Sequence, residues 1–293
     1  MREAAARRMQ MVFFRTAALF LIALTASCQA REVIKISEFP EQDRPISESI
    51  SIVSWNAEKG GNPQFNSDLS RLIILDRPDF VFLQEARADL LETKRIGGYF
   101  ASSWSYPWLN GNVIGLLSLS YVPPVRVQPM PSKHREFFIT APKLSLVTEY
   151  PLVNGQRLLA INVHLLAFER WGTNGIGSQL NDLKIAMQEH TGPIILVGDF
   201  NTWSHKRLNL VQEIADELNL TEVRDFPPGR RMADKQASFL NWLFGIDEGL
   251  PLDRVYYRGF THHSAKILPY ESSDHSAIQV TLELQPPPSS PSN

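Results

Sequence analysis

Short apolar segments rich in β-branched and aromatic residues recur along the chain, and most of them end in a carboxylate, amide or imidazole group. Segments of this length and composition predict β-strands, here over residues 51–55, 80–83, 113–119, 137–139, 158–163, 194–197, 254–257 and 277–282. Helical spacing of apolar residues predicts helices over about 66–76, 86–94, 176–190 and 206–218. Many strands with few long crossovers predict an α+β protein in which two packed sheets are flanked by helices.

The first thirty residues have the pattern of an export signal. Arginines precede an apolar run over 17–24, and small residues follow it. The run is shorter than a comfortable membrane span. Residues 24–28 resemble a lipoprotein box, with Thr25 in place of the usual leucine, whereas residues 28–30 suit an ordinary signal peptidase. We favour a lipid anchor at Cys28, and we expect the protein to be exported, either to the periplasm or as a membrane-anchored lipoprotein of the bacterial envelope.

The rest of the chain divides into a tether, a domain and a tail. Residues 31–48 are polar and acidic and predict a flexible tether. Residues 49–285 form the predicted folded domain, and the proline-rich residues 286–293 predict a disordered tail. A monomer without a protein partner is expected.

Composition excludes several classes of protein. With 43% hydrophobic and 20% charged residues, the chain is neither wholly disordered nor a polytopic membrane protein. The formal net charge is −2, and loss of the arginine-rich signal makes the remainder more acidic, so a broadly basic surface for nucleic acid is not expected. The single cysteine lies in the signal, so the mature chain has neither a disulfide nor a thiolate metal site.

Polar clusters at the strand ends are the main functional signal. One such cluster alone would simply mark the point where a strand reaches the surface, but six clusters with matching chemistry indicate a functional site. Carboxylate and amide oxygens suit Mg²⁺ or Mn²⁺ better than zinc, and histidine paired with aspartate suits proton transfer and phosphate binding. The chain contains no Gly-x-Ser-x-Gly elbow, P-loop or Gly-x-Gly-x-x-Gly fingerprint, which disfavours a covalent serine mechanism and a nucleotide-binding fold.

The order of these clusters resembles the endonuclease/exonuclease/phosphatase superfamily, which includes DNase I, abasic-site endonucleases, inositol polyphosphate 5-phosphatases and bacterial sphingomyelinases. The resemblance covers about residues 50–284 and implies a four-layered α/β/β/α sandwich with a cleft where strand ends meet. It rests on Trp55-Asn56, Gln84-Glu85, Asn162-Val163-His164, Gly198-Asp199-Phe200-Asn201, Asp253 and Ser273-Asp274-His275.

The resemblance also implies which residues would bind a metal. Glu85 resembles the principal ligand of Mg²⁺ or Mn²⁺, with Asn56 beside it. Glu58 would approach the ion directly or through water. Asp274 resembles a carboxylate on the metal side of the site or one that supports a ligand.

The catalytic assignments follow the same resemblance. Asp199 would orient or deprotonate the attacking water, with Asn201 fixing its geometry. His275, held and made more basic by Asp253, would contact the scissile phosphate. His164 matches the second histidine of the DNase I and sphingomyelinase branches, and this disfavours abasic-site repair, as does export.

Further residues are weaker candidates for substrate binding. Arg231 could contact phosphate, and Trp242 could stack on a base or meet a lipid surface, although a solvated charge and core packing are the default interpretations. Lys143 is interpreted in the same way, as a solvated loop charge.

Three functions are compatible with the sequence. The first is an exported, metal-dependent phosphodiesterase acting on nucleic acid. The second is a phospholipid or sphingomyelin phosphodiesterase at the envelope, which the lipid anchor favours. The third is a catalytically silent envelope binding protein, which the intact set of polar residues disfavours. Loops over about 100–112, 166–178 and 226–251 are expected to select the substrate.

Overall fold

Two mixed sheets form the centre of the molecule in the computed structural model, which describes residues 33–41, 43–90, 95–105, 113–136, 142–167, 173–227 and 250–286. The first has the order β1-β4-β5-β3-β2-β13-β12 and contains β1 (Val33–Ser37), β2 (Ser49–Asn56), β3 (Phe80–Arg87), β4 (Gly97–Ser105), β5 (Val113–Ser120), β12 (Phe260–Ile267) and β13 (Ile278–Leu284). The second has the order β10-β11-β9-β8-β7-β6 and contains β6 (Arg126–Arg135), β7 (Pro142–Pro151), β8 (Arg157–His164), β9 (Ile194–Asp199), β10 (Thr221–Glu222) and β11 (Asp253–Arg258).

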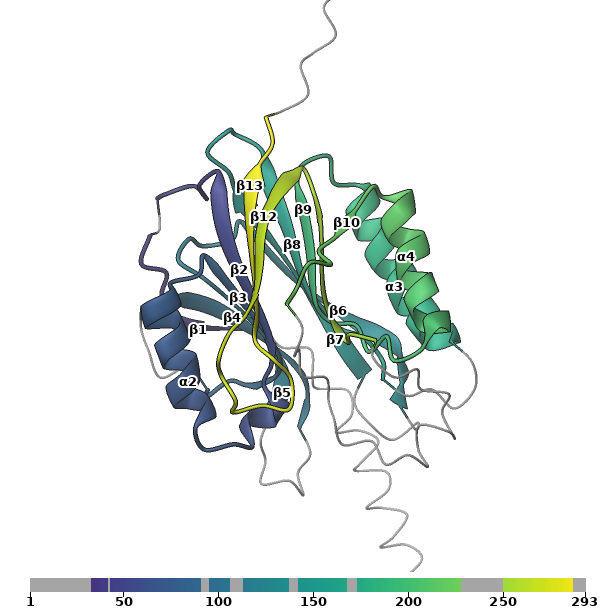
Figure 1. Cartoon of the computed structure of the whole chain (residues 1–293), viewed down its shortest axis with the longest axis horizontal. Helices are drawn as coiled ribbons and strands as arrows, with labels where there is room; N and C mark the ends of the chain where they lie inside the picture. The colour runs from purple at the N-terminus through teal and green to yellow at the C-terminus, as the bar shows by residue number, and fades with distance from the viewer. Residues whose placement is uncertain are drawn as a thin grey trace, which may run out of the picture.

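Helices cover the outer faces of both sheets. The α2 helix (Phe65–Arg71), extended by a π-helical turn over Leu72–Asp76, lies on the first sheet, and α3 (Asn174–Gln188) and α4 (His205–Glu217) lie on the second (Figure 1). A short 3₁₀ turn, η1 (Glu58–Gly60), follows β2. The layers therefore run helix, sheet, sheet, helix, and the predicted α+β sandwich is confirmed.

The central strands are buried on both faces. In β2, Ile52 faces the core between the sheets, where Val197 of β9 also packs. The alternate residues Val53 and Trp55 face the opposite way and pack with Phe65 of α2. Both faces of β2 carry large apolar residues, and these β-branched and aromatic side chains predict the strand although serines interrupt the run.

A parallel strand pair at the centre of each sheet brings polar strand ends together. In the first sheet β2 runs parallel to β3, with Asn56 beside Gln84. In the second sheet β8 runs parallel to β9, with His164 beside Asp199, and β11 begins at Asp253 directly opposite Asp199. Because parallel neighbours end at the same edge, the clusters that follow these strands meet at one end of the sandwich.

Most of the predicted elements are present, but the expected helix over 86–94 is wrong for residues 86–90, and residues 91–94 lie outside the described part of the chain. Ala86 and Arg87 instead continue β3 after a register shift, and Ala86 is fully buried. The shift lies at Glu85, whose φ of 47° is left-handed. The first two residues of the expected helix therefore belong to a bulged strand, in which the bulge interrupts the alternation of side chains.

The predicted flexible tether is also wrong for the described residues from Val33 onward. Val33–Ser37 pair with β4 and form an edge strand of the first sheet. Ile46 is buried and forms a bridge to Leu152. Backbone pairing at a sheet edge needs little apolar sequence, so the polar composition of this segment concealed a strand.

Six strands were not predicted: β1, β4, β6, β7, β10 and β12. Among them β6 carries Pro129 and Pro131, which suit the edge of a sheet but argue against a strand in sequence. The expected strand over 137–139, the signal over 1–30 with Cys28, the tail beyond 286, Arg231 and Trp242 lie outside the described residues. Among the residues that the structure describes, no helix is long and apolar enough to cross a bilayer.

Candidate active site

Asp253 and His275 form a buried ion pair. His275 Nδ1 donates a hydrogen bond of 2.8 Å to Asp253 Oδ2, and both side chains are almost fully buried. Burial alone would disfavour a charged ring, but the adjacent Asp253 carboxylate and its hydrogen bond raise the pKa of His275 to about 10. The imidazole is therefore a cation at neutral pH.

Backbone contacts fix the loop that carries His275. Trp55 Nε1 donates to the His275 carbonyl at 3.1 Å, and Ser273 Oγ donates to the Asn56 carbonyl at 2.6 Å. The His275 amide in turn donates to Ser273 Oγ at 3.2 Å. These bonds attach the Ser-Asp-His segment to the end of β2 and join two parts of the chain that are far apart in sequence.

Asp199 lies at the end of β9 and binds the polar groups on both sides of it. Its Oδ2 accepts a hydrogen bond of 3.0 Å from Asn56 Nδ2, and its Oδ1 accepts one of 2.9 Å from the Asn201 amide. Asn201 has a left-handed φ of 49° and its Nδ2 donates to the Leu165 carbonyl at 2.9 Å. The carboxylate is thus oriented from both sheets.

Gly198 shows why the Gly-Asp-Phe-Asn segment needs glycine at this point. Its φ is 140°, and a Cβ added there would lie 2.1 Å from the Val163 carbonyl oxygen. Only glycine allows β9 to approach β8 this closely immediately before Asp199.

Glu85 lies beside three basic side chains of the site. Lys59 Nζ lies 2.5 Å from Glu85 Oε2, while Lys143 Nζ and His164 Nε2 each lie 3.8 Å from Oε1. Burial favours the neutral acid, but the charges of Lys143, His164 and Lys59 lower the pKa of Glu85 to about 2. Burial also acts to lower the pKa of Lys59, yet Glu85, with Asp274 and Glu58 further away, raises it above its ordinary value.

His164 is the neutral histidine of the site. Lys143 Nζ lies 2.8 Å from its Nε2, and Asp199 Oδ2 lies 3.6 Å from the same nitrogen. Burial and the Lys143 ammonium lower the pKa of His164 to about 4, so the ring is uncharged at neutral pH. An ammonium has no acceptor atom, so Nε2 accepts from Lys143 and the ring proton is on Nδ1.

The predicted metal ligands Asn56, Glu58 and Asp274 lie on the side of the site that the first sheet forms. The Glu58 amide donates to Asn56 Oδ1 at 3.0 Å, and Glu58 Oε2 accepts from the Asp274 amide at 3.2 Å. In the described part of the chain no three acidic, histidine or cysteine side chains enclose one point. Proteins usually bind Mg²⁺ through a small number of carboxylates, and water molecules and amide oxygens complete the coordination. This donor set therefore fits Mg²⁺ or Mn²⁺ rather than zinc.

A buried amide pair connects the two sheets beneath the site. Gln84 Nε2 of β3 donates to Asn162 Oδ1 of β8 at 2.8 Å. Asn162 Nδ2 donates to the Leu83 and Leu117 carbonyls at 3.1 and 3.2 Å. Both amides are fully buried, so they position the strands that carry Glu85 and His164 and do not contact a substrate.

Three basic residues of the site were missed or misread in the sequence. Lys143, interpreted as a solvated loop charge, instead contacts His164 and lies close to Glu85 and to Glu136. Lys59 was not singled out, although its position in the turn after β2 was a usable signal. The third residue is Arg207, the largest charged side chain to be almost completely buried.

Arg207 fixes the loops after β8 and β9. Its Nε donates to the Asn201 carbonyl at 2.8 Å, and its Nη2 donates to the Leu166 carbonyl. Trp203 lies against the guanidinium, 4.9 Å from ring centroid to Cζ, and donates from Nε1 to the Ala167 carbonyl at 2.7 Å. Arg207 thereby connects the segment containing Asn201 to the segment that follows His164.

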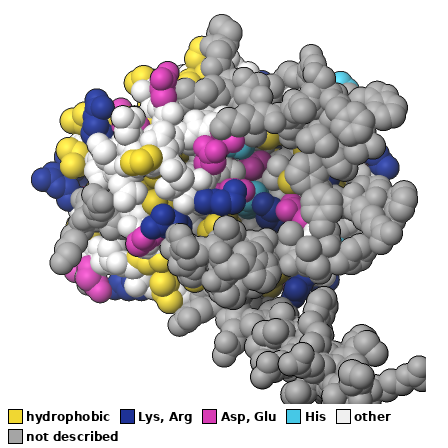
Figure 2. All heavy atoms as spheres, turned by 90° about the horizontal axis from the view of Figure 1, so that it is seen from below, with side chains coloured by type: hydrophobic (Ala, Val, Ile, Leu, Met, Phe, Trp, Pro, Cys, Tyr) yellow, Lys and Arg dark blue, Asp and Glu magenta, His cyan; other side chains and the backbone are white. Residues whose placement is uncertain are grey.

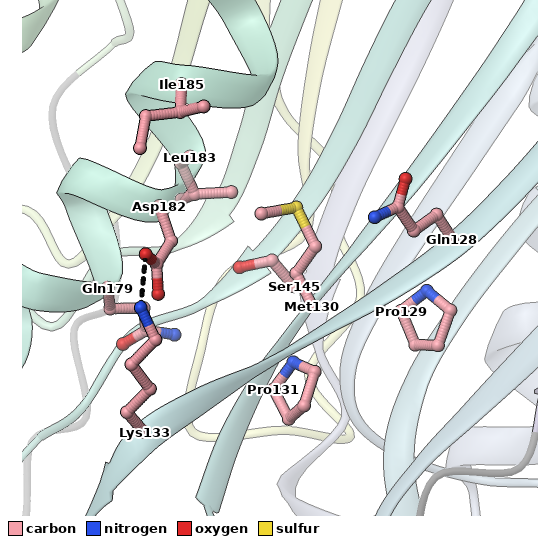
Figure 3. A pocket seen from close by; sticks show the side chains of 10 residues that line it. All are labelled: Gln128, Pro129, Met130, Pro131, Lys133, Ser145, Gln179, Asp182, Leu183 and Ile185. Carbon is pink, nitrogen blue, oxygen red and sulfur yellow. Dashed lines mark hydrogen bonds and ion pairs between the residues drawn. The ribbon is translucent and has the colours of Figure 1, made fainter.

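A separate cavity of about 380 Å³ lies between β6 and α3 (Figure 3). Met130 and Leu183 form apolar walls, and Lys133 and Asp182 form an ion pair of 2.7 Å at its side. Gln179 lines the cavity and also donates to the His164 carbonyl at 3.3 Å. The cavity therefore adjoins the loop after β8 but contains none of the predicted catalytic side chains.

Charged groups of both signs gather on one face of the molecule (Figure 2). Lysine or arginine, acidic and histidine side chains are mixed there, and the visible described surface carries no continuous basic patch. This agrees with the acidic balance of the sequence.

The fold and the polar strand ends define the class of protein. The family model for the endonuclease/exonuclease/phosphatase family matches residues 53–275, and the chain belongs to this family. It is a hydrolase of the phosphoesterase type. Among its relatives, UPF0294 proteins of Vibrio parahaemolyticus and Vibrio vulnificus are 30% and 31% identical to it, over 80% of this chain and 78% and 77% of theirs.

Solved structures share the fold at low sequence identity. An endonuclease/exonuclease/phosphatase family protein of Leptotrichia buccalis is 15% identical, with a TM-score of 0.62 over 80% of this chain and 100% of that one. The catalytic domain of human nocturnin is 16% identical, with a TM-score of 0.59 over 89% and 99%. These similarities confirm the four-layered sandwich.

Proposed function

We propose that this protein is an exported, divalent-metal-dependent phosphodiesterase that hydrolyses nucleic acid by in-line attack of water. The observation that carries the proposal is the pairing of a cationic His275, held by Asp253, with a second carboxylate, Asp199, whose charge also acts on the His275 ring. A fixed cation and a fixed base side by side suit attack on an anionic phosphorus centre.

Asp199 is positioned to act on the nucleophile. Its two oxygens are already oriented by Asn56 and Asn201, and each oxygen has a further lone pair for a water hydrogen. The water oxygen forms the new bond to phosphorus, the leaving oxygen departs on the opposite side, and the water proton passes to Asp199. His275 is a donor that stabilises the charge on a non-bridging phosphate oxygen.

Glu85, Asn56, Glu58 and Asp274 are the residues that would hold Mg²⁺ or Mn²⁺. When bound, the ion supplies Lewis-acid stabilisation of the negative charge on the phosphate. His164 is neutral and hydrogen-bonded to Lys143, so it serves the site as a polar contact beside Asp199 rather than as a second cation.

Nucleic acid is the proposed substrate because the histidine pattern resembles that of DNase I, and phospholipid is the alternative. The test is an assay of the mature chain from residue 31 onward, which keeps the β1 strand, with Mg²⁺ or Mn²⁺. Plasmid DNA, RNA, bis-p-nitrophenyl phosphate and sphingomyelin vesicles are compared. We expect cleavage of a nucleic acid and of the synthetic diester.

Asp199→Asn is the matched negative control, because it keeps the size of the side chain and removes the base. Loss of metal-dependent turnover in this variant assigns the activity to the site. Cleavage of vesicles alone would replace nucleic acid by phospholipid, and absence of hydrolysis of every substrate would favour the silent binding protein.

Export is tested separately from activity. Cys28→Ser removes the thiol that would carry a lipid, so the protein should move from the membrane fraction to the soluble envelope fraction. Fatty-acid labelling that is the same in both proteins would support the ordinary signal peptidase instead.

A further inference from the structure

The two lysines that neutralise Glu85 are held in different ways. Lys59 Nζ contacts Oε2 at 2.5 Å, whereas Lys143 Nζ stays 3.8 Å from Oε1. The Lys59 side chain is 57% exposed and the Lys143 side chain only 17%. One ammonium is thus bound directly to the carboxylate from the solvent side, and the other supports it from within.

Lys143 is fixed by other partners. It is hydrogen-bonded to His164 Nε2 at 2.8 Å and lies 3.9 Å from Glu136 Oε1. Moving it away from Glu85 would leave the lone pair of a buried imidazole without its donor, which is costly. Lys143 is therefore a permanent part of the site.

Lys59 has a different setting. It stands in the η1 turn with a left-handed φ of 61°, on the side where Glu58 and Asp274 also act on its charge. These are the same carboxylates that would hold a divalent ion. The Lys59 ammonium lies 2.5 Å from Glu85 Oε2, and the Glu85 side chain is only 18% exposed. A divalent ion bound to the same carboxylate would therefore be strongly repelled by this ammonium.

We propose that the Lys59 ammonium is a tethered cation that occupies the Glu85 side of the metal site and leaves it when a divalent ion binds. The inference rests on the proposed metal dependence. On metal binding, the ion pair between Glu85 and Lys59 would be replaced by one between Glu85 and the metal ion, so Glu85 is neutralised in both states. The apparent metal affinity is lowered by the fraction of molecules in which Lys59 occupies the site.

Calorimetric titration of the metal-free mature protein with MnCl₂, and then MgCl₂, tests the exchange. If Lys59 occupies the site in nine molecules of ten, Lys59→Met should bind the ion about tenfold more tightly. Lys59→Arg keeps a cation on a long side chain and should stay within about threefold of the wild type. It also provides a result if Lys59→Met does not fold, as judged by circular dichroism.

Lys143→Met is the matched control, because it removes the same charge near the same carboxylate without emptying the place beside Oε2. Loss of this charge should also tighten the ion, but clearly less than Lys59→Met does, because Lys143 does not occupy the place of the ion beside Oε2. Equal tightening in Lys59→Met and Lys143→Met would reduce the effect to the general electrostatic field, and the exchange would have to be given up.

A spectroscopic measurement follows the ammonium itself. In protein labelled with ¹³C at lysine Cε, saturating Mg²⁺ should shift the Lys59 signal, identified by its absence in Lys59→Arg. The signal of Lys133, paired with Asp182 away from the site, should stay in place. An unmoved Lys59 signal in a protein that binds Mg²⁺ overturns the exchange.

The outcomes distinguish a failure of the role proposed for Lys59 from a failure of the proposed metal-dependent function. A wild type that binds Mn²⁺, with Lys59→Met no tighter, rejects the role of Lys59 and keeps the metal-dependent enzyme. Absence of Mn²⁺ and Mg²⁺ binding to the wild type and to Lys59→Met rejects both.

Discussion

The two buried histidines of the site have the same ring but opposite charge. His275 has a carboxylate at 2.8 Å and a pKa raised to about 10, whereas His164 has an ammonium at 2.8 Å and a pKa lowered to about 4. Their exposures, 4% and 6%, are almost the same. Burial disfavours the charged form of both rings and is the largest cause at His164, so the difference between the two comes from the nearest partner, which overcomes burial at His275 and adds to it at His164.

This difference divides the site into two parts. On the side of His275 an acid and an imidazolium form a fixed pair that can face a phosphate. On the side of His164 two lysines neutralise Glu85 and keep the imidazole uncharged. One side presents a fixed cation and the other a carboxylate, and this division suits the anionic substrate and divalent ion of the proposed function.

The largest expected effect comes from removing the cationic ring. His275→Gln should lower kcat by about 10² to 10⁴-fold, because the charged donor to the phosphate is lost. Metal affinity measured by calorimetry should change little. A variant whose rate is restored by excess Mn²⁺ would instead make His275 a metal ligand and end the division between the two sides.

Asp253→Asn should lower kcat less, by about 10 to 100-fold, since an amide still accepts the Nδ1 hydrogen bond but no longer favours the imidazolium. The double variant Asp253→Asn, His275→Gln should be hardly worse than His275→Gln alone. Losses that multiply would show that the two residues act independently, and the pairing would then have no role in turnover.

The pKa of His275 also predicts how stability depends on pH. The folded value of about 10 is above the ordinary 6.5, so the unfolded chain loses its proton first. The stabilisation is fully present below pH 6.5 and is lost as pH rises through 10, at about 1.4 kcal/mol per pKa unit. Urea unfolding of the wild type should show this fall, and His275→Gln should show a smaller one.

The smallest expected effect concerns the part of the site around His164. Lys143→Met removes the ammonium beside His164, so the pKa of this ring should rise from about 4 by about one unit or more, still opposed by burial. Titration of the His164 Cε1 proton by NMR measures it. A pKa that stays at its wild-type value would mean that burial alone keeps His164 neutral.

The sequence predicted most of the central strands, but it missed β7, which is mostly buried, because polar residues such as Ser145, Thr148 and Glu149 interrupt its apolar pattern. The strands β2, β3, β8 and β9 were visible because both of their surfaces are apolar, and their polar ends supplied Asn56, Glu85, His164 and Asp199. The edge strands β1, β6 and β12 were not, because an edge is selected by backbone pairing and tolerates polar residues and proline.

The same reasoning explains which site residues were found. Asp199 and His275 lie in motifs and need no spatial information to be recognised. The roles of Lys59, Lys143 and Arg207 depend on how far a flexible side chain reaches in the folded molecule, and sequence spacing does not contain that distance. A buried arginine such as Arg207 looks like any surface arginine of an amphipathic helix until the loop packed against it is known.

Glu85 stands at φ 47°, a conformation that glycine adopts freely and that costs a glutamate of the order of 1 kcal/mol or more. A mutant library screened only for thermal resistance is therefore expected to enrich glycine at residue 85, provided the gain in backbone freedom outweighs the lost ion pair with Lys59. The selected variants would be more heat-resistant but would lack the carboxylate that we propose as the principal metal ligand, so directed evolution of this enzyme needs an activity screen beside any heat challenge.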